Sequence, residues 1–363
     1  MNDSLTYKDA GVDIEAGNEA VKRIRNILSN SPRSVPGGEV IGGIGGFAGL
    51  FKPALQNYAD PLLVSATDSV GTKILTAIEY DKLEWIGYDL VGMNVNDLLA
   101  CGARPMFFLD YLGLHVANPV QIERIVKSVN DACIESECLL IGGECAEMPD
   151  MYEPGKTDLA GFAVGIVDRE KVIHGKAVRA GDIVLGLASN GLHSNGFSLI
   201  RKLIVRENWD MNSKIDGDDR PLIDIILAPT RLYVKQIHAL IDKVGINADG
   251  GVRALAHITG GGLIDNVPRS FPENFAWKVN LDGWTSPPIF KMIKKSARLP
   301  RCGLWETFNC GIGYTVIVGA EFADEAEKSL KDSGEKVYRL GEIIPASDEY
   351  GDNVVIDSKG LWD

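Results

Sequence analysis

Residues 62–73, LLVSATDSVGTK, combine an apolar, strand-like segment with a polar turn. The turn brings together the acid Asp68, the glycine Gly71, the hydroxyl of Thr72 and the ammonium of Lys73. A carboxylate beside flexible backbone donors and one ammonium suits a metal-bound polyphosphate. Turns after strands also carry Asp and Gly for backbone reasons alone. The stretch therefore leaves a ligand site and a plain turn as alternatives.

Two further acids follow within the next eighty residues and favour the ligand site. Asp97 lies three residues after Asn94 in the apolar, helix-like segment 86–101, and Glu144 follows a short strand and a Gly-Gly turn. A buried carboxylate costs several kcal/mol unless it is paired, and few bases are close in sequence. Mg²⁺ prefers oxygen ligands from a few carboxylates and from substrate phosphates. We therefore expect these acids to serve a magnesium ion, with separate caps and exposed acids as the alternative.

Composition limits the classes of partner. The chain has 363 residues, which fits two domains, and its 50 acids against 37 bases give a net charge of −13. It has no basic run and no apolar stretch of membrane-spanning length, and because its first twenty residues lack an apolar core we expect no signal peptide. The six cysteines show no metal-binding spacing, which is typical of reduced thiols. We expect a cytoplasmic protein that binds neither nucleic acid nor a membrane.

The order of predicted elements favours the α+β class. Helical periodicity covers 16–30, 86–101 and 119–133, and strand-like segments cover 107–114, 138–141 and 160–167, without steady βαβ alternation. Polar residues at 168–182 place a domain boundary there, which gives domains 1–172 and 173–363. The second half predicts a helix after Asn195, one after Pro229 and one over 322–333, and strands over 183–188, 312–318 and 353–357.

A glycine-rich segment at 42–49 has the spacing Gly43-x-Gly45-x-x-Ala48, which matches a loose dinucleotide-binding pattern. We expect no strand before it and no helix after it. A flexible loop is therefore the preferred interpretation, with a nucleotide contact as the alternative.

Three motifs in the second half suit ligand contact. His193-Ser194-Asn195 precedes an amphipathic helix, where backbone amides bind anions, although Ser194 or Asn195 would serve equally well as an N-cap. His193 could hydrogen-bond a phosphate or carry a proton. The segment HITGGG (257–262) contains Gly260 and Gly261, which allow a ligand to approach the backbone. A mobile connector would need the same composition, so it is the alternative. TFNCGIG (307–313) precedes a strand.

Taken in order, eight motifs resemble the phosphoribosylformylglycinamidine cyclo-ligase (aminoimidazole ribonucleotide synthetase) family. They are DAGVDI (9–14), TDSVGTK (67–73), VNDLLACGARP (95–105), FFLDY (107–111), GGECAEMP (142–149), HSNGFSL (193–199), HITGGG (257–262) and FNCGIGY (308–314). The resemblance covers nearly the whole chain. Two positions depart from the family pattern, namely Ser69 in place of a glycine and Cys145 in place of a threonine.

The resemblance implies a two-domain α+β fold. The N-terminal domain would bind ATP and pair its sheet with that of a second copy in a homodimer, and a C-terminal domain of mixed sheet flanked by helices would complete the substrate cleft. It implies Mg²⁺ at Asp68 and Asp97 and catalytic roles for Lys73, His193 and Asn195. The nucleotide contacts would come from both domains: Asp68, Gly71, Thr72, Lys73, Asn94, Asp97, Glu144, Ser194, Gly260 and Gly261.

The implied reaction is ATP-dependent ring closure of formylglycinamidine ribonucleotide to aminoimidazole ribonucleotide in purine biosynthesis, with release of ADP and phosphate. Phosphoryl transfer needs positioning and charge neutralisation more than a covalent nucleophile, and the sequence has no obvious nucleophilic triad. Related ATP-using families, such as thiamine-monophosphate kinases and selenophosphate synthetases, are the nearest alternatives. A non-catalytic nucleotide-binding module with the same fold is another.

Overall fold

The computed structural model describes residues 11–43, 46, 48–247, 250–280, 282–347 and 353–356, with only the backbone for 301, 302 and 356. Contacts between residues divide the chain into two compact units. The first comprises 1–98 and 104–166, and the second comprises 99–103 and 167–363. The sequence places the boundary after residue 172, whereas the contacts divide the chain after residue 166.

The first unit contains two sheets. The four-stranded sheet has the order β4-β7-β5-β6, with β5 antiparallel to β7 and parallel to β6. The second sheet is a small antiparallel one of order β1-β2-β3. The strands are β1 (Ser34–Val35), β2 (Gly38–Ile41), β3 (Leu50–Pro53), β4 (Pro61–Ser69), β5 (Arg104–Leu114), β6 (Leu139–Glu147) and β7 (Thr157–Asp168).

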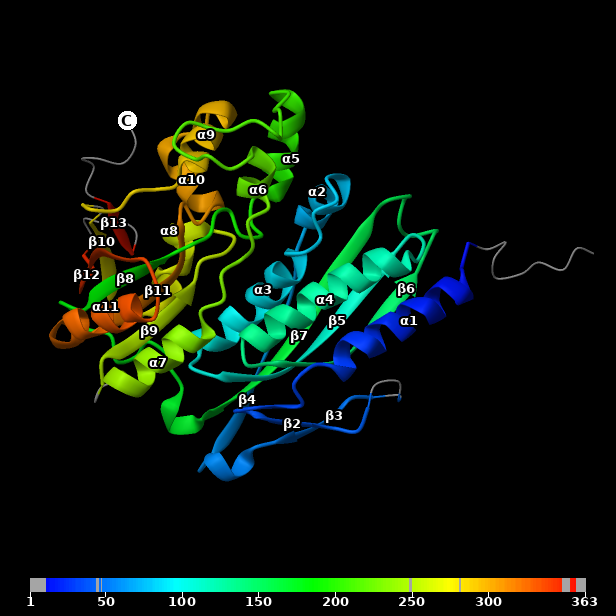
Figure 1. The fold of residues 1–363 in the computed structure, drawn as a ribbon. Helices are drawn as coiled ribbons and strands as arrows, with labels where there is room; N and C mark the ends of the chain where they lie inside the picture. Colours follow the sequence, from blue (N-terminus) through cyan, green and yellow to red (C-terminus); the bar gives the residue numbers. More distant parts are fainter. Residues whose placement is uncertain are drawn as a thin grey trace, which may run out of the picture. The chain divides into compact units, whose positions relative to one another are not determined.

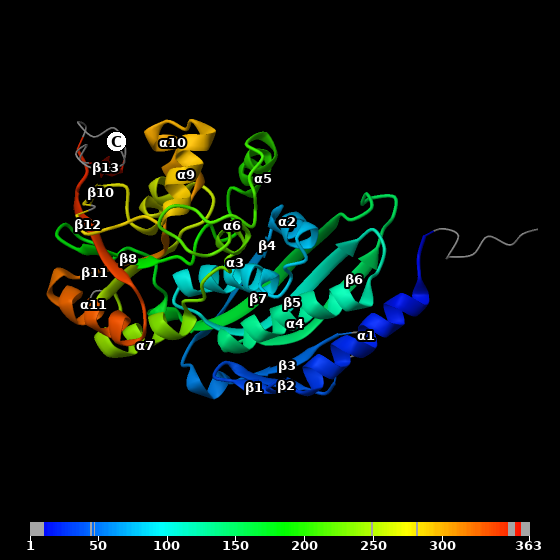
Figure 2. The ribbon, with the colours of Figure 1, turned by 45° about the horizontal axis from the view of Figure 1, so that its top comes forward.

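Among the described residues of the first unit, the helical segments are α1 (Ile14–Ser29), η1 (Leu55–Asn57), α2 (Lys73–Glu79), α3 (Ile86–Ala100) and α4 (Pro119–Glu135). Asn118 caps α4, and Pro119 occupies its first turn, as the sequence predicts. Helix α4 packs against β6, and α1 packs along α4 (Figure 2). The predicted helices at 16–30, 86–101 and 119–133 are confirmed to within a few residues.

The two faces of the four-stranded sheet differ in burial. On β5, Phe108 and Leu112 are fully buried, and they lie on the same face as Asp110. The opposite face leaves large apolar side chains exposed, including Phe162, which pairs with Leu109, and Leu63, which is 69% exposed. Helices therefore cover one face of this sheet, while the single chain leaves the other partly open.

The second unit is built on a six-stranded sheet of order β13-β10-β12-β8-β11-β9, in which only the β10–β13 pair is parallel. The edge strand β9 and its neighbour β11 are buried along their whole lengths. The strands are β8 (Ile183–Ala188), β9 (Val252–His257), β10 (Phe275–Val279), β11 (Ile312–Val318), β12 (Val337–Pro345) and β13 (Val354–Ile356).

Helices lie on both sides of this sheet. Figure 1 shows α7 and α11, which pack on each other, at one side, and α8, α9 and α10 toward the other. The helical segments are η2 (Arg169–Lys171), α5 (Phe197–Arg206), α6 (Leu222–Ile226), α7 (Val234–Val244), α8 (Gly262–Asn266), η4 (Pro268–Ser270), α9 (Pro288–Ala297), α10 (Arg301–Thr307), η5 (Ala320–Phe322) and α11 (Ala323–Asp332). The α+β class is thus confirmed in both units.

The glycine-rich segment differs from its prediction in one respect. Strand β2 precedes it, and strand β3 follows it, so the segment connects two antiparallel strands. The expectation that no strand precedes it is wrong, because β2 is short and ends directly at the first glycine of the run. The central residues of the fingerprint, 44, 45 and 47, lie outside the described residues. No helix that the structure describes has the length and apolar character needed to cross a membrane.

Candidate functional site

The turn after β4 has the geometry that its sequence predicts. Asp68 is the penultimate residue of the strand, and its Oδ1 accepts a hydrogen bond of 2.7 Å from the backbone N–H of Ser69. Gly71 has φ +56°, a conformation that favours glycine, and its N–H donates to Ser69 Oγ at 3.3 Å. The Ser69 hydroxyl therefore helps to close the turn. Thr72 then precedes the first residue of α2, Lys73.

Lys73 is buried and forms an ion pair. Its Nζ lies 2.7 Å from the carboxylate of Asp89, and each side chain is 1% exposed. Burial lowers the pKa of Lys73, and the opposite charge of Asp89 counteracts part of that effect. The ammonium therefore faces a carboxylate inside the unit, and a contact between Lys73 and phosphate stays a prediction. The sequence interpretation did not single out Asp89. An acid within an apolar helix was itself a signal that this side chain has a buried partner.

Helix α3 places its polar residues differently from the prediction. Asn94 is fully buried, and its Nδ2 donates to the carbonyl oxygens of Leu90 at 2.8 Å and of Asp68 at 3.5 Å. Asp97, in contrast, is exposed, although its helix neighbours on both sides are buried. The expectation of a buried carboxylate at 97 is wrong for the single chain, because the helix turns this position to solvent. Asn94 joins α3 to the strand that carries Asp68.

Glu144 lies on β6 opposite Tyr111 and is exposed. Its Oε1 accepts a hydrogen bond of 2.9 Å from the N–H of Cys145. Within the described part of the chain, no three His, Cys, Asp or Glu residues form a group that could hold a metal ion. The three predicted acids therefore do not converge into a cage within one chain. Magnesium binding by Asp68 and Asp97 stays a prediction that needs further oxygen ligands, such as phosphates.

A buried acid that the sequence interpretation did not single out lies beside β6. Asp110 on β5 faces the buried side of the sheet, between Gly143 on β6 and Gly161 on β7. A Cβ atom on Gly143 would lie 1.7 Å from Asp110 Oδ1, so the carboxyl occupies the space of that missing side chain. Burial raises the pKa of Asp110 to about 7. Asp110 stands at a position of a strand whose neighbours on the same face are apolar, and an acid at such a position was the sequence signal for it.

In the second unit, His193 lies in the core of its loop. It has φ +57° and no exposed surface, and its Nε2 accepts long hydrogen bonds from the backbone N–H groups of Asn190 (3.4 Å) and Arg231 (3.3 Å). Its ring also packs on Gly313, where a Cβ would lie 2.4 Å from Cε1. The ring thus links three segments of the unit, and its expected part in catalysis stays a prediction.

Ser194 and Asn195 do not cap the helix that follows them. The N-cap of α5 is Gly196, with φ +76°, and no side chain caps the helix. Ser194 Oγ and Asn195 Nδ2 are buried atoms without a hydrogen-bond partner among the residues that the structure describes. The interpretation of these residues as plain caps is wrong, which leaves their polar groups available for a ligand.

The three motifs of the second half come together in this unit. A Cβ on Gly260 would lie 3.8 Å from Asn195 Oδ1, so the HITGGG segment borders the loop that contains Asn195. Gly196 packs on the ring of Phe308. Asn309 Nδ2 donates to Gly191 O at 2.9 Å, which ties the third motif to the first. This grouping, with Gly261 next along the chain, is the part of the predicted site that one unit assembles.

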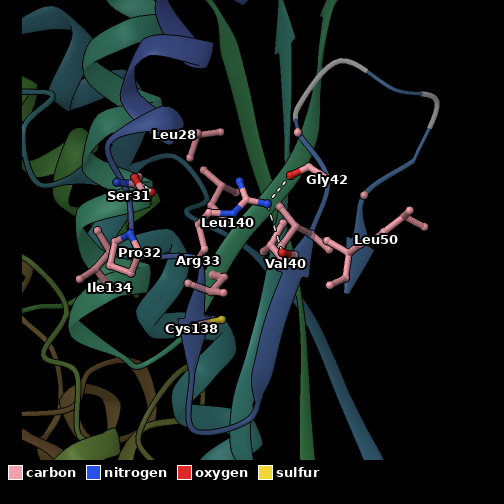
Figure 3. A pocket seen from close by; sticks show the side chains of 16 residues that line it. Leu28, Ser31, Pro32, Arg33, Val40, Gly42, Leu50, Ile134, Cys138 and Leu140 are labelled. Carbon is pink, nitrogen blue, oxygen red and sulfur yellow. Dashed lines mark hydrogen bonds between the residues drawn. The ribbon is translucent and has the colours of Figure 1, made fainter. Parts of the chain in front are cut away.

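A small pocket of about 40 Å³, partly open to solvent, lies elsewhere in the first unit. Figure 3 shows Arg33 within it, with its guanidinium directed at the carbonyl oxygens of Val40 and Gly42. The lining comes from the end of α1, the β2–β3 connection, α4 and the start of β6, and it includes none of the predicted site residues. Because Arg33 is bonded to backbone carbonyls, we interpret it as a link that holds the hairpin to the end of α1.

Comparison with protein families gives two matches that together cover most of the chain. Residues 53–167 match the AIR synthase related protein, N-terminal domain, and residues 179–352 match the AIR synthase related protein, C-terminal domain. The gap between the matched regions, residues 168–178, contains the boundary placed by sequence, and the boundary placed by contacts lies just before it, after residue 166.

Similar proteins agree with these matches. A phosphoribosylformylglycinamidine cyclo-ligase of Neisseria meningitidis is 47% identical over 343 residues, which are 94% of this chain and 96% of that protein. A thiamine-monophosphate kinase from Stenotrophomonas maltophilia has the same fold, with a TM-score of 0.65 at 19% identity over 93% of this chain and 96% of that one. The hydrogenase maturation protein HypE, solved in complex with ATP, has a TM-score of 0.60 at 18% identity, over 93% and 88%.

Proposed function

The chain belongs to the phosphoribosylformylglycinamidine cyclo-ligase family, and we propose that it converts formylglycinamidine ribonucleotide and ATP to aminoimidazole ribonucleotide, ADP and phosphate. The observation that carries this proposal is 47% identity over 96% of a relative with that name. The enzyme is a ligase that forms a carbon–nitrogen bond, and the ring closure belongs to purine biosynthesis.

The chemical difficulty is the formamide, whose carbonyl carbon is a poor electrophile. Transfer of the γ-phosphoryl group of ATP to the formamide oxygen gives an iminophosphate and ADP. The amidine nitrogen of the same molecule then attacks the former formyl carbon, so that a C–N bond forms, the C–O bond breaks, and phosphate and a proton leave. Both reacting groups belong to one molecule, and correct orientation can supply about 7–11 kcal/mol of such a barrier.

The first unit would handle the nucleotide. Asp68 and Asp97 supply carboxylate oxygens of the type that Mg²⁺ prefers, and Asn94 fixes the helix that carries Asp97 against the strand that carries Asp68. Bound there, Mg²⁺ would neutralise phosphate charge. Gly71, Thr72 and Glu144 would add contacts to ATP, and Lys73 would have to share its ammonium between Asp89 and a phosphate.

The second unit would position the substrate. Its predicted residues, His193, Ser194, Asn195, Gly260 and Gly261, offer hydrogen-bonding groups and exposed backbone rather than full charges. Such groups suit the formylglycinamidine part of the molecule, which presents both donors and acceptors. We therefore assign to the substrate the three of them, Ser194, Gly260 and Gly261, that the resemblance implies as nucleotide contacts.

We also propose that the enzyme works as a homodimer. The open face of the four-stranded sheet exposes Leu63 and Phe162, and exposed apolar side chains on one sheet face are typical of an interface. A second copy of the same face is the partner that the family resemblance implies.

The test is release of phosphate from ATP in the presence of formylglycinamidine ribonucleotide. We expect release only when both substrates and Mg²⁺ are present, with aminoimidazole ribonucleotide as the product. Asp68→Asn should lower turnover on the order of a hundredfold or more, with an unchanged circular dichroism spectrum. Phosphate release without the ribonucleotide, or wild-type turnover by the Asp68 variant, would contradict the proposal.

A further inference from the structure

Gly260 is a glycine without a structural reason inside the second unit. Its φ lies outside the left-handed region, and among the residues that the structure describes Asn195 Oδ1, at 3.8 Å, is the only atom within 4 Å of a Cβ placed there. Gly262, in contrast, has φ +60°, and a Cβ there would lie 1.8 Å from Trp305 O. Glycine costs backbone entropy on folding. The absent side chain at 260 therefore leaves open space beside Asn195.

Asn266 stabilises this loop through two hydrogen bonds. It is 4% exposed, and its Nδ2 donates to the carbonyl oxygens of Gly260 at 3.1 Å and of Gly262 at 2.7 Å. Its Oδ1 accepts from Arg269 Nη1 at 3.3 Å. The positions of nitrogen and oxygen in the Asn266 amide fit both sets of contacts, because the nitrogen faces two acceptors and the oxygen faces a donor.

The orientation of one peptide bond follows from this contact. The carbonyl oxygen of Gly260 points toward Asn266, and the N–H of Gly261 belongs to the same trans peptide unit. In a trans peptide the C=O and N–H bonds point in opposite directions. The N–H of Gly261 therefore points away from Asn266.

The groups around this space define what it would accept. The side of Gly260 bears Asn195, whose Nδ2 is buried without a partner among the described residues. Beside Gly261 lies the exposed carboxylate of Asp265, with Oδ2 2.7 Å from the position of a Gly261 Cβ. A phosphate would be repelled by this carboxylate, whereas an amide or amidine group matches donors and acceptors of both kinds.

We propose that Asn266 is a positioning residue that holds the Gly260–Gly261 peptide against the formylglycinamidine end of the substrate. The inference rests on the proposed function and adds to it both a residue and the part of the substrate that the loop contacts. Asn266 acts through the loop and has no direct contact with the substrate.

The first experiment measures steady-state kinetics of Gly260→Ala. Because a methyl group at 260 meets no atom closer than 3.8 Å, the melting temperature should stay unchanged. The KM for the ribonucleotide should rise about tenfold or more, while the KM for ATP changes less than about twofold. The matched control is Gly17→Ala in α1, another glycine with open space and a φ outside the left-handed region, which should leave both KM values unchanged.

The second variant, Asn266→Asp, keeps the size of the side chain but replaces both N–H donors. It should raise the KM for the ribonucleotide in the same selective way. This inference alone is overturned if the wild-type enzyme is active but Gly260→Ala leaves the KM for the ribonucleotide unchanged. It is also overturned if the wild-type enzyme is active and Gly260→Ala changes the KM values for the ribonucleotide and for ATP equally. Absence of wild-type turnover would overturn the proposed function, and the inference with it.

Discussion

The two units carry predicted site residues of different chemical kinds. Those of the first unit include four charged side chains, Asp68, Lys73, Asp97 and Glu144. Those of the second are a histidine, two neutral polar residues and two glycines, packed into one group of loops. The first unit thus offers charge for a polyphosphate, and the second offers hydrogen bonds and open backbone for a substrate with amide-like groups.

The difference also concerns how each unit holds these residues. In the second unit, close contacts at Gly196, Gly262 and Gly313 lock the loops together. In the first, Asp97 and Glu144 are exposed, and among these four residues only Lys73 is fully buried. Charges that must be neutralised by a ligand gain nothing from burial in its absence, because desolvation would oppose folding. The exposure of the acids is therefore the arrangement expected before ligand binding.

Lys73 is the exception, and replacing it should have the largest effect. Lys73→Met leaves Asp89 as a buried charge without its ammonium, which should lower the free energy of unfolding by about 3–5 kcal/mol. The double variant Lys73→Met/Asp89→Asn removes both charges and should recover most of this loss. Urea unfolding followed by circular dichroism measures both changes.

Turnover of the double variant decides between two roles of the lysine. If Lys73 also contacts phosphate, the double variant is stable but remains inactive. Recovery of both stability and turnover would make Lys73 purely structural and would remove it from the charged site of the first unit.

Much of the fold follows from sequence periodicity. Helices α1, α3 and α4 and strand β11 agree with their predictions because each shows one clear pattern over many residues. The short helices α6, α8 and α10 were not predicted, since five to seven residues contain too little of a helical repeat. Strand β2 was not predicted either, because it is only four residues long.

The candidate site could be predicted only in part. Motifs singled out Asp68 and Asn195 as candidates, because these residues lie close to glycines in distinctive turns. Sequence could not reveal that Asp89 pairs with Lys73 or that Asn266 supports Gly260, since both facts depend on side-chain contacts between turns or elements. The sequence also could not show that Asp97 is exposed to solvent, because the apolar neighbours of that residue in the helix are buried.

Asp110 should give a smaller effect that depends on pH. Its pKa is about 7 in the folded chain and near its ordinary value of 3.8 in the unfolded chain, so the folded chain binds more protons between these values. Stability should therefore fall as the pH rises toward 7. Asp110→Asn removes this cost and should gain about 3 kcal/mol relative to the wild type between pH 5 and pH 8. Urea unfolding at several pH values measures the difference, and a gap that stays constant with pH would contradict the assignment.

Glu144→Gln should change stability least. The side chain is exposed, and the hydrogen bond from the Cys145 N–H can be kept by the amide oxygen, so the free energy of unfolding should change by less than about 0.5 kcal/mol. If Glu144 serves the nucleotide, turnover and the KM for ATP should nevertheless change, while the KM for the ribonucleotide stays constant. Gly260→Ala is expected to show the opposite selectivity, so the two variants together separate the charged unit from the neutral one. Equal effects of both variants on both KM values would mean that the two units do not divide nucleotide and substrate between them.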